Sequence, residues 1–319
     1  MKKVVRLGTR RSKLALWQAN HIADLIRRHH ADADVQIREY RTRSDRNMSA
    51  PLRSISGGGL FTDALEAALL AGEIDGAVHS LKDLPVKIAP GLSLAAVPKR
   101  GHHRDALVSR SGAGLAQLRQ GARIGTGSLR RRAQLLALRS DLKMMHIRGN
   151  VPTRLEKLRA DDGQFDAIVL AAAGLNRLGL TEQISQIFDE GQMLCAAGQG
   201  ALALQCRDDG DDLAFFGPLA DWRTTQATAA ERAFLSVLDA GCSLPVAAYA
   251  YVDGNRLLLQ GRVIALDGGR QVDIAGGAGA IEGASGMTLA QELGAALAAK
   301  ALEQGARRIL EAIDVKEDR

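Results

Sequence analysis

The sequence predicts an α/β protein followed by a smaller α+β domain. In two segments, about 4–97 and 123–177, short apolar strands alternate with turns and amphipathic helices, which is typical of β-α-β units. Such units indicate a parallel sheet with right-handed crossovers. From about Asp221 a helix is followed by three strand-like runs joined by hairpin turns, and then by a last helix.

The first segment begins with a β-α-β unit and contains one irregular stretch. A helix capped by Ser12 follows the first strand, because Ala15, Ala19 and Ile22 recur at helical spacing. The predicted elements are, in order, strand 4–8, a helix from 12, strand 35–40, helix 61–72, strand 76–79 and strand 92–97. Residues 42–60 have no apolar period and include three consecutive glycines, so we expect a functional lid or a disordered segment.

The second segment repeats this order, and the last domain departs from it. A hinge is predicted at 98–101 (PKRG), between the first two segments. The second segment is predicted to contain strand 123–126, a helix from 129, strand 144–147, a helix through 154–158 and strand 167–170. The last domain is predicted to contain helix 225–238, strands 246–252, 256–265 and 271–275, and a helix through 289–297.

Composition excludes several classes of protein. The 319 residues are 46% hydrophobic and carry a net charge of +6, as expected of a globular protein of two or three domains with an anionic partner. Aromatic residues make up only 3%, too few for the stacking surfaces of single-strand nucleic-acid binders. The three cysteines are widely spaced, which predicts neither a disulfide framework nor a metal site. With no long apolar run and no export signal, we expect a cytoplasmic chain that binds neither membrane nor nucleic acid.

One cysteine lies on a predicted bend. Cys242 follows Gly241 and precedes Pro245, between the helix that ends near Leu238 and the strand that begins near Val246. Glycine permits a sharp turn and proline prevents the helix from continuing, so the thiol is expected to be exposed. Taken alone, a lone cysteine is more often a small buried apolar residue. Its neighbours elsewhere in the chain favour a chemical role.

Arginines recur where predicted strands lead into helices. Helix amino termini attract anions, and a guanidinium group donates two parallel hydrogen bonds to a carboxylate. Taken one by one, these arginines could be ordinary surface charges, but together they predict a cleft for a polycarboxylate or polyphosphate. No P-loop motif is present, which disfavours a nucleotide site. The arginines are Arg10, Arg130, Arg131, Arg148, Arg154 and Arg177.

An acidic residue is predicted at the same kind of position. Lys82 and Asp83 follow strand 76–79, at the carboxyl edge where open α/β sheets bind ligands. The alternative is a turn aspartate that bonds its own backbone. A carboxylate among many arginines fits a ligand that has an anionic rim and a centre that becomes positive during a reaction.

The chain resembles the porphobilinogen deaminase family over essentially its full length. Eight separate stretches carry the resemblance, in the family's order. They are 9–18 (TRRS with LALWQ), 59–61 (GLF), 78–85 (VHSLKDLP), 125–131 (GTGSLRR), 148–154 (RGNVPTR), 173–179 (AGLNRLG), 198–201 (GQGA) and 241–245 (GCSLP).

The resemblance implies a fold of two lobes like those of type II periplasmic binding proteins, placed around a cleft, and a small C-terminal α+β domain. Domain 1 would comprise 1–99 and 199–219, domain 2 would comprise 100–198, and domain 3, with the cofactor cysteine, would comprise 220–319. The family default is a monomer.

The resemblance also implies a reaction and a set of site residues. Four porphobilinogen molecules would be joined head to tail, with loss of ammonia, on a dipyrromethane cofactor attached to Cys242 by a thioether. Asp83 would be the catalytic acid and would stabilise a cationic azafulvene. The cofactor would be bound by Lys82, Asp83, Thr126, Ser128, Arg130 and Arg131, and no metal is implied. The substrate chain would be bound by Arg10, Ser12, Phe61, Arg148, Arg154, Arg177 and Gln199.

Four positions depart from the family pattern, and two other functions compete. Gly58 stands where the family has lysine, Gly127 where it has serine, Pro152 where it has glycine, and Ala196 where it has proline. Because none of these is an implied catalytic residue, we expect an active enzyme. The competing functions are a non-catalytic two-lobed receptor or effector domain for a small polyanion, and a basic RNA-binding protein.

Overall fold

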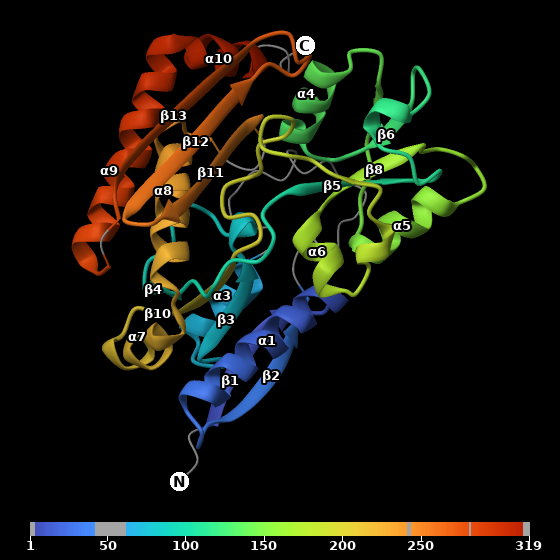
Figure 1. Cartoon of the computed structure of the whole chain (residues 1–319). Helices are drawn as coiled ribbons and strands as arrows, with labels where there is room; N and C mark the ends of the chain where they lie inside the picture. The colour runs from blue at the N-terminus through green and yellow to red at the C-terminus, as the bar shows by residue number, and fades with distance from the viewer. Residues whose placement is uncertain (1–3, 42–61, 241–243, 281, 315–319) are drawn as a thin grey trace. The chain divides into compact units, whose positions relative to one another are not determined.

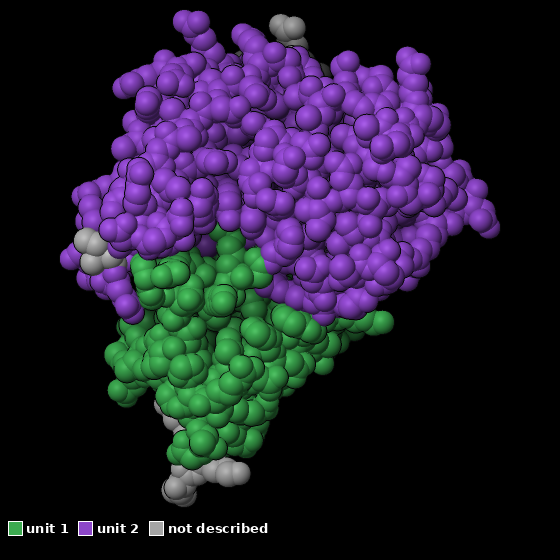
Figure 2. Space-filling view, viewed as in Figure 1, with its two compact units in different colours: residues 1–101, 200–225 green, residues 102–199, 226–319 purple. Residues whose placement is uncertain are grey.

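The computed structural model describes residues 4–41, 62–240, 244–280 and 282–314. The chain forms two compact units, distinguished by colour in Figure 2. Unit 1 comprises residues 1–101 and 200–225, and unit 2 comprises residues 102–199 and 226–319. Unit 2 contains two separate sheets, and the chain divides into two units where three domains are predicted. The division into three domains therefore stays a prediction.

Unit 1 is built on a five-stranded sheet in the order β2-β1-β3-β10-β4 (Figure 1). Its strands are β1 (Val4–Arg10), β2 (Asp34–Tyr40), β3 (Gly76–Ser80), β4 (Leu92–Ala96) and β10 (Leu202–Arg207). Strand β1 runs parallel to β2 and β3, whereas β10 runs antiparallel to β3 and β4.

Helices cover both faces of this sheet. The hydroxyl of Ser12 caps α1, as predicted, and the apolar stripe of α1 packs with Leu7 and Phe216 in one core. On α3, Leu65 and Leu69 pack with Ile74 in a second core. The helices of unit 1 are α1 (Lys13–His29), α3 (Asp63–Leu70) and α7 (Gly210–Phe216), with 3₁₀ turns η1 (Leu81–Asp83) and η4 (Gly217–Leu219).

Unit 2 contains a similar sheet in the order β7-β6-β8-β5-β9. Its strands are β5 (Asp105–Ser109), β6 (Arg123–Gly125), β7 (Lys143–Met145), β8 (Ala167–Ala171) and β9 (Gln186–Ile187). Strand β6 runs parallel to β7 and β8, and β5 runs antiparallel to β8 and β9. The helices are α4 (Leu129–Leu138), α5 (Val151–Arg159) and α6 (Ala172–Arg177), with 3₁₀ turns η2 (Leu115–Gln117) and η3 (Thr181–Gln183).

The prediction of parallel sheets is wrong for one strand in each sheet. Strands β5 and β10 are antiparallel, and the sequence analysis assigned neither as a strand. Each follows a passage of the chain from one unit to the other and has no β-α-β pattern around it. Two five-stranded α/β sheets, each with one antiparallel strand next to its edge, and a separate three-stranded sheet confirm the expected α/β class with a small C-terminal α+β part.

The third sheet is antiparallel, in the order β11-β12-β13. Gly254 and Gly268 adopt positive φ in its two turns and confirm the predicted hairpins. Gly261 on β12 faces Phe234 of α8, and Gly276 on β13 faces Leu297 of α9. The elements are α8 (Trp222–Val237), β11 (Val246–Asp253), β12 (Arg256–Ile264), β13 (Gln271–Gly279), α9 (Ala284–Ala301), the π-helical turn η5 (Leu302–Ala306) and α10 (Arg307–Asp314).

A buried glutamate joins this sheet to the rest of unit 2. The carboxylate of Glu231, on α8, accepts hydrogen bonds from the backbone N–H of Gly198 at 2.6 Å and of Ala250 at 2.7 Å. Arg262 of β12 also donates to Gln134 of α4 at 3.1 Å. These bonds join α8 to β11 and to the segment around Gly198, and they join β12 to α4.

Helices α8 and α9 pack so closely that a glycine is required between them. A Cβ atom at Gly294 would lie 2.2 Å from the carbonyl oxygen of Ala230 and 2.8 Å from the Cβ of Ala233. Backbone atoms cannot move aside as a flexible side chain can, so any larger residue must push the helices apart.

We therefore expect Gly294→Ala to destabilise the chain by about 1–3 kcal/mol, as overpacked cores do. Gly279→Ala on β13 is the matched control, because nothing lies within 4 Å of its added Cβ. Urea unfolding monitored by circular dichroism measures both variants. Equal midpoints for Gly294→Ala and Gly279→Ala would contradict the close packing.

Candidate active site

The carboxyl edge of the first sheet brings together predicted site residues from two strands. Arg10 ends β1, and the turn η1, directly after β3, contains Lys82 and Asp83. Because β1 and β3 are parallel, both strands end at the same edge. Ser12 follows Arg10, and its Oγ accepts the N–H of Ala15 at 3.2 Å. Asp83 and Lys82 are half-buried.

A buried histidine lies next to this edge. Burial, with a smaller contribution from the positive charge of Arg10, lowers the pKa of His79 to about 4. The ring nitrogen Nε2 of His79 lies 3.1 Å from Oε1 of Gln205 on the neighbouring β10. His79 is therefore neutral at physiological pH.

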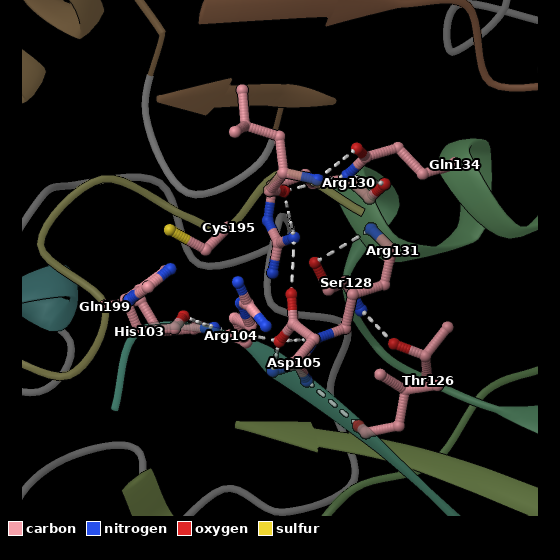
Figure 3. A network of polar contacts seen from close by, with 12 residues as sticks. His103, Arg104, Asp105, Thr126, Ser128, Arg130, Arg131, Gln134, Cys195 and Gln199 are labelled. Atoms are coloured by element: carbon pink, nitrogen blue, oxygen red, sulfur yellow. Dashed lines mark hydrogen bonds and ion pairs between the residues drawn. The ribbon is translucent and has the colours of Figure 1, made fainter. Parts of the chain in front are cut away.

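In unit 2, two of the predicted cofactor arginines bind one buried aspartate (Figure 3). Arg130 donates through Nη1 to Oδ2 of Asp105 at 2.8 Å. Arg131 donates through Nε at 2.9 Å and through Nη2 at 2.7 Å to Oδ1 of the same carboxylate. All three side chains are buried. The sequence analysis took these arginines as ligands for a bound anion and missed this internal partner.

The network around Asp105 extends to the backbone and to Gln199. Arg130 also donates to the carbonyl of Leu194 at 2.8 Å, and Arg131 to that of Val169 at 3.0 Å. The amide nitrogen of Gln199 lies 3.0 Å from Oδ1 of Asp105. Burial raises the pKa of the Asp105 carboxyl, but the two guanidinium groups outweigh burial and hold that pKa well below its usual range. The carboxylate therefore stays charged.

Two predicted hydroxyl ligands cap helix α4. Oγ of Ser128 accepts the N–H of Arg131 at 3.4 Å, and Oγ1 of Thr126 accepts the N–H of Ser128 at 3.1 Å. Both residues follow β6, so they lie at the carboxyl edge as predicted. Their hydroxyl groups fix the turn that leads into the two arginines.

A second group of cations comprises Arg148, between β7 and α5, and Arg154 and Lys157 on α5. Nε of Arg154 donates to the carbonyl of Gly149 at 2.7 Å, and Nζ of Lys157 donates to the carbonyl of Arg148 at 3.2 Å. Within the described residues, Nη2 of Arg148 is buried and has no hydrogen-bond partner. A buried donor without a partner is costly, so this guanidinium group is suited to an anionic ligand.

The remaining predicted residues divide between this unit and the undescribed part of the chain. Arg177 ends α6, and burial lowers its pKa to about 10, so it stays charged at neutral pH. Gln199 donates to the carbonyl of His103 at 2.7 Å, in addition to its contact with Asp105. Cys242, Phe61 and Gly58 lie outside the described residues.

The two described cysteines do not serve as exposed nucleophiles. Cys195 and Cys206 are both buried, and burial raises the pKa of Cys206 to about 12. Among the described residues, no group of histidine, cysteine and acidic side chains is arranged to hold a metal ion. The helices described here also include none with the length and apolar character that a membrane span requires.

Sequence reasoning missed Asp105 and Glu231, two buried carboxylates that bind distant segments of unit 2. One signal for Asp105 was available: it directly precedes the apolar run 106–108, and two adjacent arginines that become buried need a carboxylate. No comparable signal marks Glu231, because its partners are backbone N–H groups of distant segments.

Comparison with known proteins shows similarity to one family over nearly the whole chain. Residues 5–214 match the family model described as "Porphobilinogen deaminase, dipyromethane cofactor binding domain", and residues 225–303 match its "C-terminal domain". The porphobilinogen deaminase of Roseiflexus sp. (strain RS-1) is 46% identical over 97% of this chain and 99% of its own. That of Syntrophotalea carbinolica is 45% identical over 98% of this chain and 96% of its own. Among solved structures, the methionine binding protein MetQ matches 78% of this chain and 99% of its own, with 13% identity and a TM-score of 0.44.

The buried ion pairs of Asp105 predict that Asp105→Asn strongly lowers the stability of the fold. The substitution leaves two buried guanidinium groups without a counter-charge, and we expect the free energy of unfolding to fall by about 3–5 kcal/mol at pH 7. Urea unfolding measures the change. Asp24→Asn is the control, because its pair with Arg27, at 2.9 Å, is exposed on both sides and contributes little.

The same pair predicts a pH dependence. The folded-state pKa of Asp105 lies below its unfolded value of about 3.9. The stability that its ion pairs contribute is therefore complete above about pH 3.9 and is lost as the pH falls through the folded-state pKa. The stability gap between wild type and Asp105→Asn should therefore narrow below about pH 4. A gap that stays constant down to acid unfolding would contradict the assignment.

Proposed function

Since the chain belongs to the porphobilinogen deaminase family, we propose how its own residues perform the family's reaction. The enzyme is a transferase, a hydroxymethylbilane synthase of tetrapyrrole biosynthesis. It condenses four porphobilinogen molecules head to tail with release of ammonia, and water then releases the linear product. The observation that carries the residue assignment is the buried, unpartnered Nη2 of Arg148 at an edge rich in arginine.

The cofactor of the family is dipyrromethane, and the described residues fit it. Its acetate and propionate groups need several guanidinium and hydroxyl donors, and β6 and β7 lead into such donors. When bound, it supplies the pyrrole end to which the first substrate is joined. We assign its attachment to the thiol of Cys242, as a thioether. The residues proposed to seat its carboxylates are Lys82, Thr126, Ser128, Arg130 and Arg131.

The bonds of Arg130 and Arg131 to Asp105 limit how many of their N–H donors can bind a ligand. Arg131 uses Nε, Nη1 and Nη2 in bonds to Asp105 and Val169, so it contributes mainly a fixed positive charge. Arg148 has a buried donor to spare and is the stronger candidate for a direct carboxylate contact. With it we group the other residues proposed to bind the substrate chain, which are Arg10, Ser12, Phe61, Arg154, Arg177 and Gln199.

Asp83 is proposed as the catalytic acid. It lies in the turn η1 at the carboxyl edge of its sheet, half-buried and reachable by a ligand. Its carboxyl group can donate a proton to the leaving amine and can then, as a carboxylate, stabilise positive charge that develops on the substrate pyrrole. Among the residues proposed here it is the acid, whereas the arginines bind carboxylates.

The other proposals concern the state and the partners of the chain. We propose a cytoplasmic monomer whose partner is the small molecule porphobilinogen and which binds neither nucleic acid nor membrane. The non-catalytic receptor remains the competing function. It predicts tight binding of small polyanions without turnover.

Incubation with porphobilinogen tests the function directly. Wild type is expected to form a product that oxidises to uroporphyrin, measured by absorbance. Asp83→Asn keeps the size of the side chain but removes the acid, so turnover should fall by about 10²–10⁴-fold. Asp24→Asn, on the exposed surface of α1, is the matched control in the same unit.

Two results would count against these assignments. Near-normal turnover by Asp83→Asn would exclude Asp83 as the acid, while leaving the family function intact. Absence of any turnover by the wild-type holoenzyme, together with binding of porphobilinogen, would favour the receptor.

A further inference from the structure

The imidazole of His146 contacts the arginine that has the unpartnered donor. Nε of Arg148 donates to Nε2 of His146 at 3.2 Å, and both residues lie in the segment between β7 and α5. His146 has no assigned role in the family resemblance or in the comparisons. Its geometry nevertheless determines how Arg148 is held.

The direction of this hydrogen bond fixes the state of the histidine. A guanidinium group has only donors, so Nε2 of His146 must present its lone pair. The imidazole is therefore neutral and carries its proton on Nδ1. Protonation of Nε2 would remove the acceptor and place a second positive charge against Arg148.

We propose that neutral His146 is a positioning residue that aims Arg148 at a ligand carboxylate. The bond to Nε2 fixes the guanidinium through its Nε, on one side of the group. Nη2 is then left buried and without a partner among the described residues, available for a carboxylate oxygen. The proposal rests on the proposed function, because the carboxylate is that of a pyrrole substrate.

The neighbourhood of Gly127 supports this role. A Cβ atom at position 127 would lie 3.5 Å from Cε1 of His146 and 3.2 Å from the carbonyl oxygen of Ile147. The imidazole thus packs beside the position where the family has a serine. In this chain a glycine leaves the backbone unobstructed there, and the adjacent histidine supplies a polar side chain.

Desolvation and the surrounding positive charges keep His146 neutral. Partial desolvation lowers the pKa of His146, and the cations Arg148, Arg154 and Lys157 lower it further. These cations are the charged groups that act on the ring within the described residues. Above about pH 6.5, the ordinary pKa of histidine, the ring is therefore deprotonated and can accept the Arg148 N–H. Below the lowered pKa it becomes protonated and the contact is lost.

NMR of the histidine side chains tests the geometry independently of catalysis. In chain labelled with ¹⁵N-histidine, the signal of His146 is assigned by its loss in His146→Gln. We expect the Nδ1–H tautomer and a titration midpoint below about 6.5. Arg148→Lys removes the Nε donor and should shift the tautomer toward a mixture. A His146 ring protonated on Nε2 at pH 8 would overturn the proposal, even if the enzyme is fully active.

Steady-state kinetics of the holoenzyme test the consequence for binding. His146→Phe keeps a ring but has no acceptor, and we expect KM for porphobilinogen to rise about five-fold at pH 7.5, with kcat within about two-fold. His146→Gln restores an acceptor oxygen and should return KM to within about two-fold of wild type. His29→Phe is the control, because His29 is an exposed histidine at the end of α1.

The pH dependence of KM distinguishes a positioning role of His146 from a merely structural one. Wild-type KM should rise as the pH falls through the pKa of His146, whereas KM of His146→Gln should lack that rise, since the amide does not titrate. Superimposable profiles of the two proteins, or an unchanged KM in His146→Phe, would overturn the proposal. Loss of turnover by wild type would instead contradict the proposed function and leave the NMR result to decide the geometry.

Discussion

The second unit depends on one carboxylate that neutralises two buried arginines. Two guanidinium groups cannot be placed inside a protein without a counter-charge, because desolvation would cost several kcal/mol for each. Asp105 supplies that charge, with contacts of 2.7–2.9 Å to Arg130 and Arg131. Its position follows from strand direction. Strand β5 is antiparallel, so its first residue, Asp105, lies opposite Ala171 at the edge where the parallel strand β8 ends.

In the first unit, an antiparallel strand also begins at the edge where a parallel strand ends. Strand β10 is also antiparallel, and its first residue, Leu202, lies opposite Ser80 at the end of β3. The N–H of Leu81 donates to the carbonyl of Ala201 at 3.0 Å, so the start of β10 holds the turn that contains Asp83. In both sheets, a strand that begins after the chain passes between units organises the functional edge. The antiparallel strands thus hold residues that are proposed to form the site.

Much of this could be predicted from the sequence, and the limits have physical reasons. Local signals were sufficient for α1, whose cap Ser12 and apolar stripe are confirmed, and for the hairpins at Gly254 and Gly268. The positions of Arg10, Thr126 and Ser128 at strand ends also followed from local pattern. Strand β5 and the pairing of Asp105 could not be derived in this way, because they depend on partners 25 or more residues away. His146 was missed for another reason: its role depends on a contact with Arg148 that composition and spacing do not reveal.

We propose that the thiol of Cys242 tethers a growing polyanionic chain while arginines hold its carboxylates and Asp83 acts on each incoming ring. Intact-mass spectrometry of the purified chain during brief exposure to porphobilinogen tests it most directly. We predict a ladder of covalent species, spaced by one pyrrole unit and ending before a fifth addition, and peptide mapping should place every adduct on Cys242. A chain whose mass never changes, or whose adducts map to Cys195 or Cys206, would contradict the claim.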